Sequence, residues 1–195
     1  MRTKNTRRTF LGAASAGGLA AACDFGFLSQ LPSVSAEDAH LKPTLVQLDG
    51  QIESLVRLIE NTQRDTLLEQ VAERIRKGTS YREILAALLL AGVRNVQPRP
   101  SVGFKFHCVL VVNSCHLASR SGPDEDRWLP IFWALDYFKS SQADEAERSG
   151  WRMQSVNELA VPDVRHSRSL FLEAMDKWDT EKADVATAGL VRAAG

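Results

Sequence analysis

Apolar residues recur at helical spacing along most of the chain, and this spacing favours a helical fold over any other. Residues 63–77 place their apolar side chains on one helix face, and Gly78 follows as a typical C-terminal stop. Ser80 and Glu83 have the spacing of a capping box that opens the next helix. Further helices are expected over residues 128–135, 170–178 and 179–194. The sequence therefore predicts an all-α fold.

Residues 104–117 form the segment whose structure is hardest to read from the sequence. They are apolar and partly β-branched, and periodicity alone does not separate a buried helix from a buried strand here. The length of the segment and the helices on both sides favour a helix. We therefore expect a central helix, buried nearly all round, with the helical domain built about it.

Charge divides the chain into a basic leader and a mildly acidic remainder. The 195 residues hold 24 basic and 24 acidic side chains, but the first 36 hold four basic ones against one acidic one. The remainder has no basic cluster, so nucleic-acid binding is not expected. No run of 18 apolar residues follows the leader, so no membrane span is expected in the mature chain.

The leader has the three parts of a signal peptide in the right order. A basic region ends at Arg7 and Arg8, a weakly apolar stretch rich in Ala and Gly follows, and small residues end at Ala36. Arg7, Arg8, Phe10 and Leu11 match the twin-arginine signal pattern. We therefore expect residues 1–36 to be a twin-arginine signal peptide cleaved after Ala36, with residues 37–195 as the exported helical domain and the twin-arginine export machinery as a partner.

Two alternatives to this interpretation stay open. The residues before Cys23 resemble a lipoprotein processing site, and a lipidated Cys23 would anchor the protein to a membrane surface. The leader can also be read as a flexible basic N-terminus of a protein that stays in the cytosol. Export of folded cargo by the twin-arginine route is often linked to a cofactor, but nothing in the sequence identifies one.

The segment 104–117 also holds the only concentrated polar chemistry of the chain: His107, Cys108, Asn113, Cys115 and His116. On one helix His107 and His116 point in opposite directions, so they cannot share a metal ion. The two cysteines lie on one face but about 10 Å apart along the axis, beyond the ~7 Å limit for a disulfide. No metal site is predicted, and both cysteines are expected to be free thiols.

Two interpretations of the histidines stay open. In the first, His107 and His116 are core residues held by hydrogen bonds. In the second, one of them is an acid, base or ligand at a pocket between helices, where a small-molecule substrate would bind. We prefer His116, because Asn113 at i−3 can orient its ring, and Asp136 on the next helix is the nearest candidate for a charged partner.

Three stretches carry a resemblance to a family: Gly103 to His107, His116 to Ser119 and Arg127 to Lys139. They resemble a family of exported bacterial helical proteins with twin-arginine leaders and no assigned function. The likeness covers about residues 50–195, although members of the family carry alanine in place of Cys108 and Cys115. A fainter resemblance links the Phe104 to His107 pattern to questin oxidase-like proteins, helical enzymes that oxidise polycyclic aromatics, and it implies no residue roles.

Two functions from different classes follow from these observations. The first is an exported, oxidoreductase-like helical enzyme with His116, His107 and Asp136 at an interhelical pocket. The second is a noncatalytic periplasmic binding or scaffold protein. Members of the resembled family continue into a second helical half, and residues 183–194 form an amphipathic helix without a polar tail. We therefore expect this chain to be truncated at its C-terminus.

Overall fold

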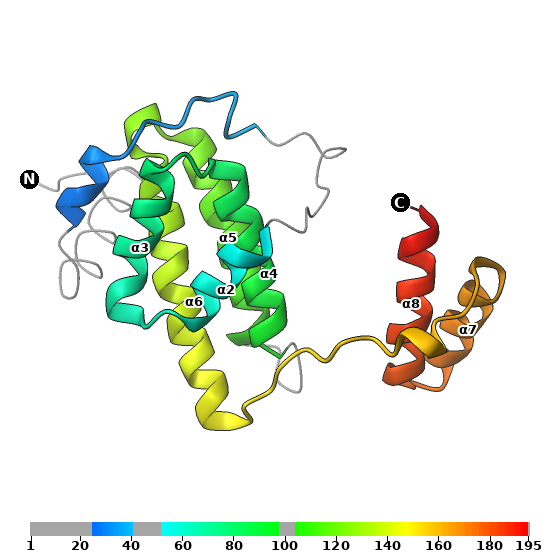
Figure 1. Ribbon diagram of the computed structural model, residues 1–195. Coiled ribbons are helices and arrows are strands. Elements are labelled where there is room, and N and C mark those ends of the chain that lie inside the picture. The colour runs from blue at the N-terminus through cyan, green and yellow to red at the C-terminus, as the bar shows by residue number, and fades with distance from the viewer. Residues whose placement is uncertain (1–24, 41–51, 98–103, 195) are drawn as a thin grey trace, which may run out of the picture. The chain divides into compact units, whose positions relative to one another are not determined.

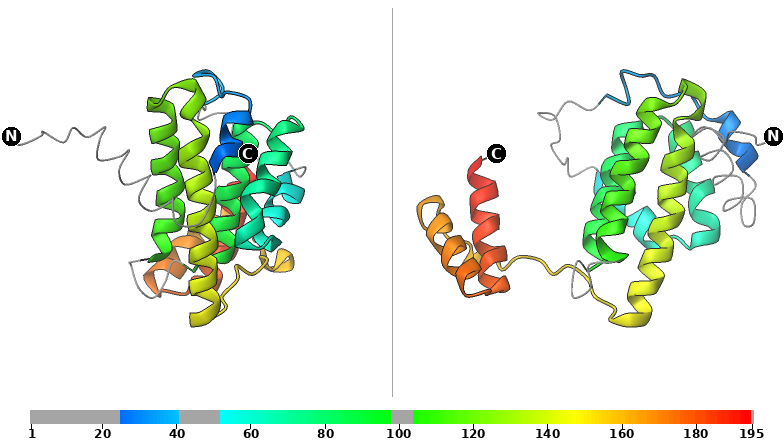
Figure 2. Two further views of the ribbon diagram at one scale, coloured as in Figure 1. Left: turned by 90° about the vertical axis from the view of Figure 1, so that its left-hand side faces the viewer. Right: turned by 180° about the vertical axis from the view of Figure 1, so that it is seen from behind.

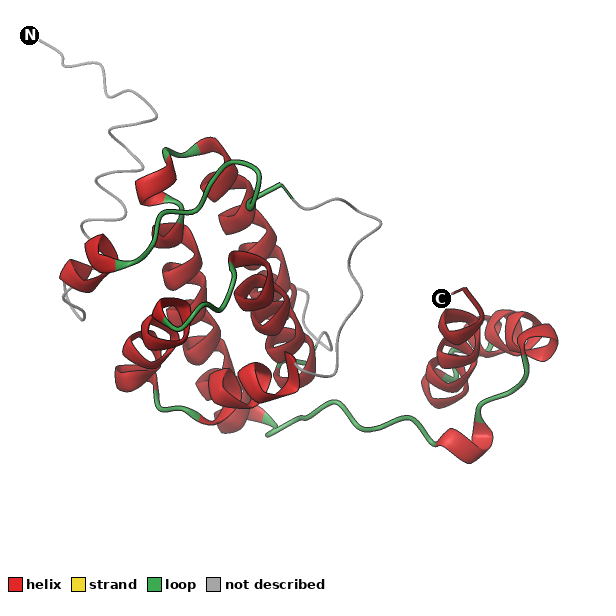
Figure 3. Ribbon diagram, turned by 45° about the horizontal axis from the view of Figure 1, so that its top comes forward, coloured by secondary structure: helices red, strands yellow, loops and turns green. Residues whose placement is uncertain are grey.

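The structure, a computed structural model, describes residues 25–40, 52–97 and 104–194 (Figure 1). Within these ranges every regular element is a helix, as the colouring of Figure 3 shows, and the all-α prediction is confirmed. The predicted leader residues Arg7, Arg8, Phe10 and Leu11, together with Cys23, lie outside the described residues. The elements are η1 (Phe25–Gln30), α2 (Glu53–Asn61), α3 (Arg64–Arg76), α4 (Tyr81–Asn95), α5 (Phe104–Ser121), η4 (Asp124–Asp126), α6 (Trp128–Arg148), η5 (Glu158–Ala160), α7 (Val164–Asp176) and α8 (Thr180–Ala194).

The chain divides into two compact units, Met1–Arg152 and Met153–Gly195. The first contains α2 to α6 and the whole large core, and the second contains α7 and α8. The sequence predicts a single helical domain over residues 37–195, whereas in the structure residues 153–195 form a unit of their own. The long connection after α6 has no buried residue between Arg148 and Arg165, which is where the two units separate.

The helix boundaries in the first unit follow the local sequence signals. Gly78 ends α3 with a φ of 102°, a left-handed conformation that glycine adopts without a steric penalty. The Ser80 side chain accepts a hydrogen bond from the Glu83 backbone N–H, and the Glu83 carboxylate accepts one from the Ser80 N–H. This is the predicted capping box, and it fixes the first residue of α4, Tyr81.

The most central helix of the first unit is α6, which packs against α3, α4 and α5. Figures 1 and 2 show α5 and α6 running side by side along most of their length. Helix α6 contributes a wide buried face that includes Ile131, Phe132, Leu135 and Phe138. Pro130 lies in the first turn of α6, where the missing backbone N–H costs no intrahelical hydrogen bond.

Segment 104–117 is helical as predicted, but the described part of α5 is not buried all round. Cys108, Val112 and Cys115 face the core, whereas Leu110 and Leu117 are 54% and 51% exposed. The helix lies at the side of the bundle, so only one of its faces meets other helices. The central position expected for this helix belongs to α6 instead.

Residues 25–40 form an N-terminal strap across the first unit. The 3-10 helix η1 packs against α3, and the chain then passes over the beginning of α6 (Figure 1). Leu31, Val34 and Ala39 of the strap are buried in the same core as the helices. The predicted cleavage site, Ala36, is itself exposed, but it lies between two buried residues of the strap, Val34 and Ala39.

Helices α7 and α8 pack against each other as a hairpin in the second unit. They approach closely at Gly189, where an added Cβ would lie 2.2 Å from the Ser167 hydroxyl oxygen. Ser167 is itself fully buried and donates to the carbonyl oxygen of Asp163. A glycine at this position is what lets the two backbones come together.

Across the described residues, no helix combines the length and the apolarity that a membrane crossing requires.

Candidate functional site

The His116 ring is held by Tyr81 rather than by Asn113. Its Nδ1 lies 3.0 Å from the Tyr81 hydroxyl oxygen, and the two ring centroids are 5.9 Å apart. Asn113 is exposed and makes no hydrogen bond to His116 in the described structure. The expected orienting partner was therefore the wrong residue, because the tyrosine that replaces it comes from the start of α4, 35 residues away in sequence.

Burial decides the protonation of this pair. It lowers the pKa of His116, with a smaller contribution from the nearby positive charge of Arg120. It also raises the pKa of Tyr81. At neutral pH the His116 ring is therefore uncharged and the Tyr81 hydroxyl keeps its proton, and the tautomer of the ring sets which of the two groups donates.

This pair predicts a pH dependence of stability. Because the pKa of His116 is lowered in the folded state, the unfolded chain takes up the proton first as the pH falls below about 6.5. The contribution of His116 to stability is fully present above that pH, and it is lost as the pH falls toward the lowered pKa of the folded state. When urea unfolding is measured at pH 7.5 and at pH 5.5, we expect the free energy of unfolding to differ less between the two pH values in His116→Gln than in the unchanged protein. If the free energy of unfolding changes equally with pH in both proteins, His116 is not the source of the pH dependence.

Asp136 does not meet His116. Its two carboxylate oxygens accept hydrogen bonds from Nε and Nη2 of Arg64, both at 2.7 Å, so α6 is tied to the start of α3. A two-point pair of this kind is geometrically specific, but its exposure limits its contribution to stability. Within the described residues no hydrogen bond or ion pair joins Asp136 to His116, and the two predicted site residues are not brought together.

The remaining chemistry of α5 is divided between described and undescribed side chains. The His107 side chain lies outside the described residues, although its backbone is helical. Cys108 and Cys115 are buried free thiols, as predicted. Burial raises the pKa of Cys108 to about 12 and that of Cys115 to about 11, so neither is a thiolate nucleophile at neutral pH. Over the part of the chain that was searched, no His, Cys, Asp and Glu side chains gather as metal ligands would.

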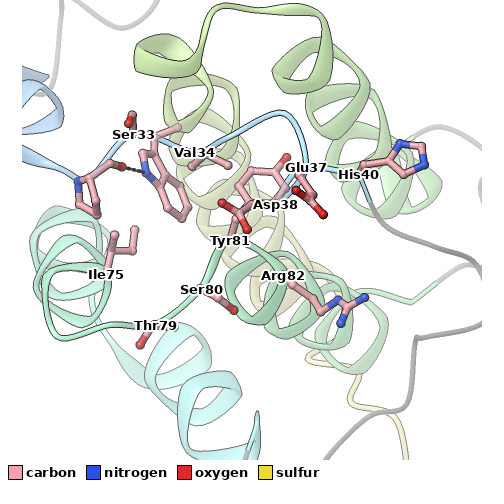
Figure 4. A pocket seen from close by; sticks show the side chains of 12 residues that line it. Ser33, Val34, Glu37, Asp38, His40, Ile75, Thr79, Ser80, Tyr81 and Arg82 are labelled. Carbon is pink, nitrogen blue, oxygen red and sulfur yellow. Dashed lines mark hydrogen bonds between the residues drawn. The ribbon is translucent and has the colours of Figure 1, made fainter.

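A cleft of about 460 Å³ opens beside Tyr81, and we call it the N-terminal cleft. The strap forms one wall and the turn between α3 and α4 forms another (Figure 4), and Trp128 of α6 also lines the cleft. Tyr81 lines this cleft, whereas His116 does not. Its lining residues are Pro32, Ser33, Val34, Glu37, Asp38, His40, Ile75, Thr79, Ser80, Tyr81, Arg82 and Trp128.

The polar groups of the cleft are unevenly placed. In Figure 4, Glu37, Asp38 and Tyr81 project into the middle of the view, and His40 and Arg82 stand toward its right-hand edge. The Tyr81 and Trp128 rings pack with centroids 5.5 Å apart. Asp38 accepts a hydrogen bond from the Ser35 hydroxyl at 2.6 Å, which holds its carboxylate in place.

No protein-family model matches this chain, and no curated protein or solved structure matches it. The resemblance drawn from the sequence therefore stays a prediction, and the functional argument depends on the site alone.

Sequence reasoning missed this cleft because its walls come from three separate segments. One signal was available: a tyrosine predicted to be buried needs a partner for its hydroxyl group, and Tyr81 follows directly after the capping serine. The strap gives no signal of this kind in the sequence, because the predicted cleavage after Ala36 divides residues 32–40 between the leader and the mature chain.

A second polar cluster was also missed, in the middle of α6. The Lys139 ammonium donates to the carbonyl oxygens of Ile59 and Glu60 at 3.4 and 3.1 Å. These carbonyls belong to the last turn of α2, where no intrahelical donor reaches them. Gln142 and Asn95 join the same cluster by hydrogen bonds. This cluster has a structural role, since it caps one helix with the side chain of another.

Proposed function

We propose that this protein is exported and binds a small organic cation in the N-terminal cleft without acting on it chemically. The observation that carries the proposal is the pairing of two adjacent carboxylates, Glu37 and Asp38, with the aromatic side chains Tyr81 and Trp128 in one cleft. Carboxylates attract an ammonium group directly, and aromatic rings attract it through their π electrons.

The size of the cleft supports a small ligand. Its volume of about 460 Å³ lies within the range of roughly 300–1,000 Å³ that is typical of small-molecule sites. Ile75 and Pro32 add apolar surface for the body of the ligand. A ligand that also carries an acidic group would place that group toward Arg82.

The positions of the other candidate groups favour binding over catalysis. His116 lies behind Tyr81 rather than on the cleft, and Asp136 is paired with Arg64. The two cysteine thiols are buried with raised pKa values. His40, the histidine that lines the cleft, is hydrogen-bonded through Nδ1 to Arg120 rather than to a carboxylate, and no activated nucleophile stands among the described lining residues.

One observation favours the enzyme as a second candidate. The Tyr81 side chain lines the cleft, and its hydroxyl group is hydrogen-bonded to His116, so a proton could pass from a bound molecule through Tyr81 to the imidazole. Tyr81→Phe separates the two candidates, since it keeps the ring and removes the hydroxyl group. A binding protein would keep its affinity for amines within about twofold, whereas an enzyme of this kind would lose turnover.

The binding test compares ligands that differ only in charge. We expect phenethylamine to bind in calorimetric titration and to shift the Trp128 indole N–H signal in NMR spectra, and 3-phenylpropionate to do neither. Glu37→Gln should weaken amine binding about tenfold, since it removes one charge from the cleft. Glu69→Gln, an exposed position outside the cleft, is the matched control. Binding of the carboxylate that depends on Arg82 would overturn the proposed ligand class.

The export part of the proposal has its own test. Replacing both Arg7 and Arg8 by lysine keeps the positive charge but removes the paired arginines of the signal pattern. We expect the precursor to accumulate in the cytoplasm, measured by immunoblotting of cell fractions. Lys4→Arg in the same basic region is the control and should leave export unchanged. Unchanged export of the double lysine variant would contradict the twin-arginine assignment.

A further inference from the structure

We infer that the strap, residues 25–40, is a permanent part of the folded protein, so that any removal of the leader occurs before Phe25 and not after Ala36. This inference concerns maturation of the chain and is independent of what the N-terminal cleft binds. It replaces the cleavage site that the sequence favours with one that the packing allows.

Apart from Ala39, the buried apolar side chains of the strap lie in the part that cleavage after Ala36 would remove. Leu31 and Val34 are buried, with Val34 only 3% exposed. The Phe27 ring packs against Phe132 of α6 with centroids 5.4 Å apart. Phe132 is among the largest fully buried side chains of the structure, so loss of the partly buried Phe27 would uncover apolar surface of the core.

The polar contacts with η4 and with the start of α6 come from the same part of the strap, whereas the contact of His40 with Arg120 of α5 lies beyond Ala36. The Trp128 indole N–H donates to the carbonyl oxygen of Pro32 at 2.9 Å, and the Val34 N–H donates to that of Asp124 at 3.4 Å. The buried Arg127 guanidinium donates to the carbonyl oxygen of Val34.

Arg127 makes this loss costly. The guanidinium also donates to the Asp124 carboxylate, but its Nε has no hydrogen-bond partner among the described residues. Removal of Val34 would take away one of the acceptors of a buried charge that is already incompletely paired. A buried charge that loses a partner is strongly destabilising.

The peptide bond after Ala36 also lies within a hydrogen-bonded turn. The Ala39 N–H donates to the Ser35 carbonyl oxygen at 3.1 Å, and the Asp38 N–H donates to the Ser35 hydroxyl oxygen at 3.0 Å. Ala36 and Glu37 are exposed, so the hydrogen bonds of the turn, and not burial, are what a protease would have to overcome here. Cargo of the twin-arginine route would present the turn already folded.

The same segment also forms part of the N-terminal cleft. Pro32, Ser33 and Val34 line the cleft and would be lost by cleavage after Ala36. Cleavage before Cys23, the alternative processing site in the sequence, would leave the entire strap in the mature chain.

The first test determines the N-terminus of the folded protein purified from its host, by intact mass and N-terminal peptide mapping. We expect the chain to begin at or before Phe25, and a start at Cys23, with or without a lipid, is one such result. A folded protein that begins at Glu37 would overturn the inference. If fractionation shows that the unchanged protein stays in the cytoplasm, the same measurement on the cytoplasmic protein decides.

The second test uses point variants of the full chain and needs no export. Val34→Asp places a carboxylate in the core and should lower the melting temperature by about 10 °C or more, whereas Ser33→Asp at the exposed neighbouring position should change it by less than about 2 °C. If Val34→Asp does not fold, Val34→Ala gives a graded loss in its place. A Val34→Asp or Val34→Ala protein that melts like the unchanged chain would overturn the inference.

Discussion

Replacement of Phe132 by alanine is expected to lower the free energy of unfolding of the first unit by about 3–5 kcal/mol. The side chain is fully buried on α6 and contacts both Phe27 of the strap and Trp128, with ring centroids 5.4 and 6.2 Å away. The loss combines the transfer of a large apolar side chain with the cavity that remains, and the helix backbones around it cannot close that cavity completely.

Urea unfolding followed by circular dichroism measures this loss. The control is Leu110→Ala on α5, at a side chain that is more than half exposed, and we expect a change within about 0.5 kcal/mol. Equal losses in the two variants would mean that the core is not centred on α6. A small loss in Phe132→Ala would further mean that η1 does not pack on this helix.

Gly189→Leu is expected to unfold the α7–α8 hairpin while the first unit stays folded. A Cβ at this position would lie 2.2 Å from the Ser167 hydroxyl oxygen and 3.0 Å from the Pro162 carbonyl oxygen, so a leucine has no space unless the helices separate. The higher helix propensity of leucine contributes only about 1 kcal/mol in the opposite direction. A unit as small as residues 153–195 has little stability to lose.

Hydrogen exchange read out by mass spectrometry locates the effect. Peptides of α7 and α8 should lose protection in Gly189→Leu, and peptides of α4 and α6 should keep it. Val191→Leu is the matched control, because it enlarges a side chain on the same helix that is 65% exposed. Retained protection of α7 and α8 in Gly189→Leu would contradict the close approach of the two helices.

Local signals along the chain were sufficient to predict α3, α4, α5, α7 and α8, but they predicted neither α2 nor the C-terminal part of α6. Gly78 and the Ser80–Glu83 capping box mark the end of α3 and the start of α4, and each acts through its own backbone within one turn. The free thiols of Cys108 and Cys115 followed from the rise of a helix in the same way. Interactions of this range depend on neighbours in sequence, so the sequence alone determines them.

The depth of a helix in the core depends on contacts between distant segments. The apolar run of α5 predicted burial all round, but α5 has packing partners on one side only, and α6 takes the central position. The amphipathic pattern of a helix indicates which of its faces is apolar, but it does not indicate how many neighbouring helices cover the other faces.

The partners of the site residues were decided by tertiary structure alone. Asp136 pairs with Arg64 and His116 pairs with Tyr81, in both cases across a long separation in sequence. A side chain with several possible partners takes the one that packing brings within hydrogen-bond distance, and spacing along the chain does not contain that information. The strap follows the same rule: its sequence has the composition of a leader, and only its burial against Phe132 and Trp128 makes it part of the fold.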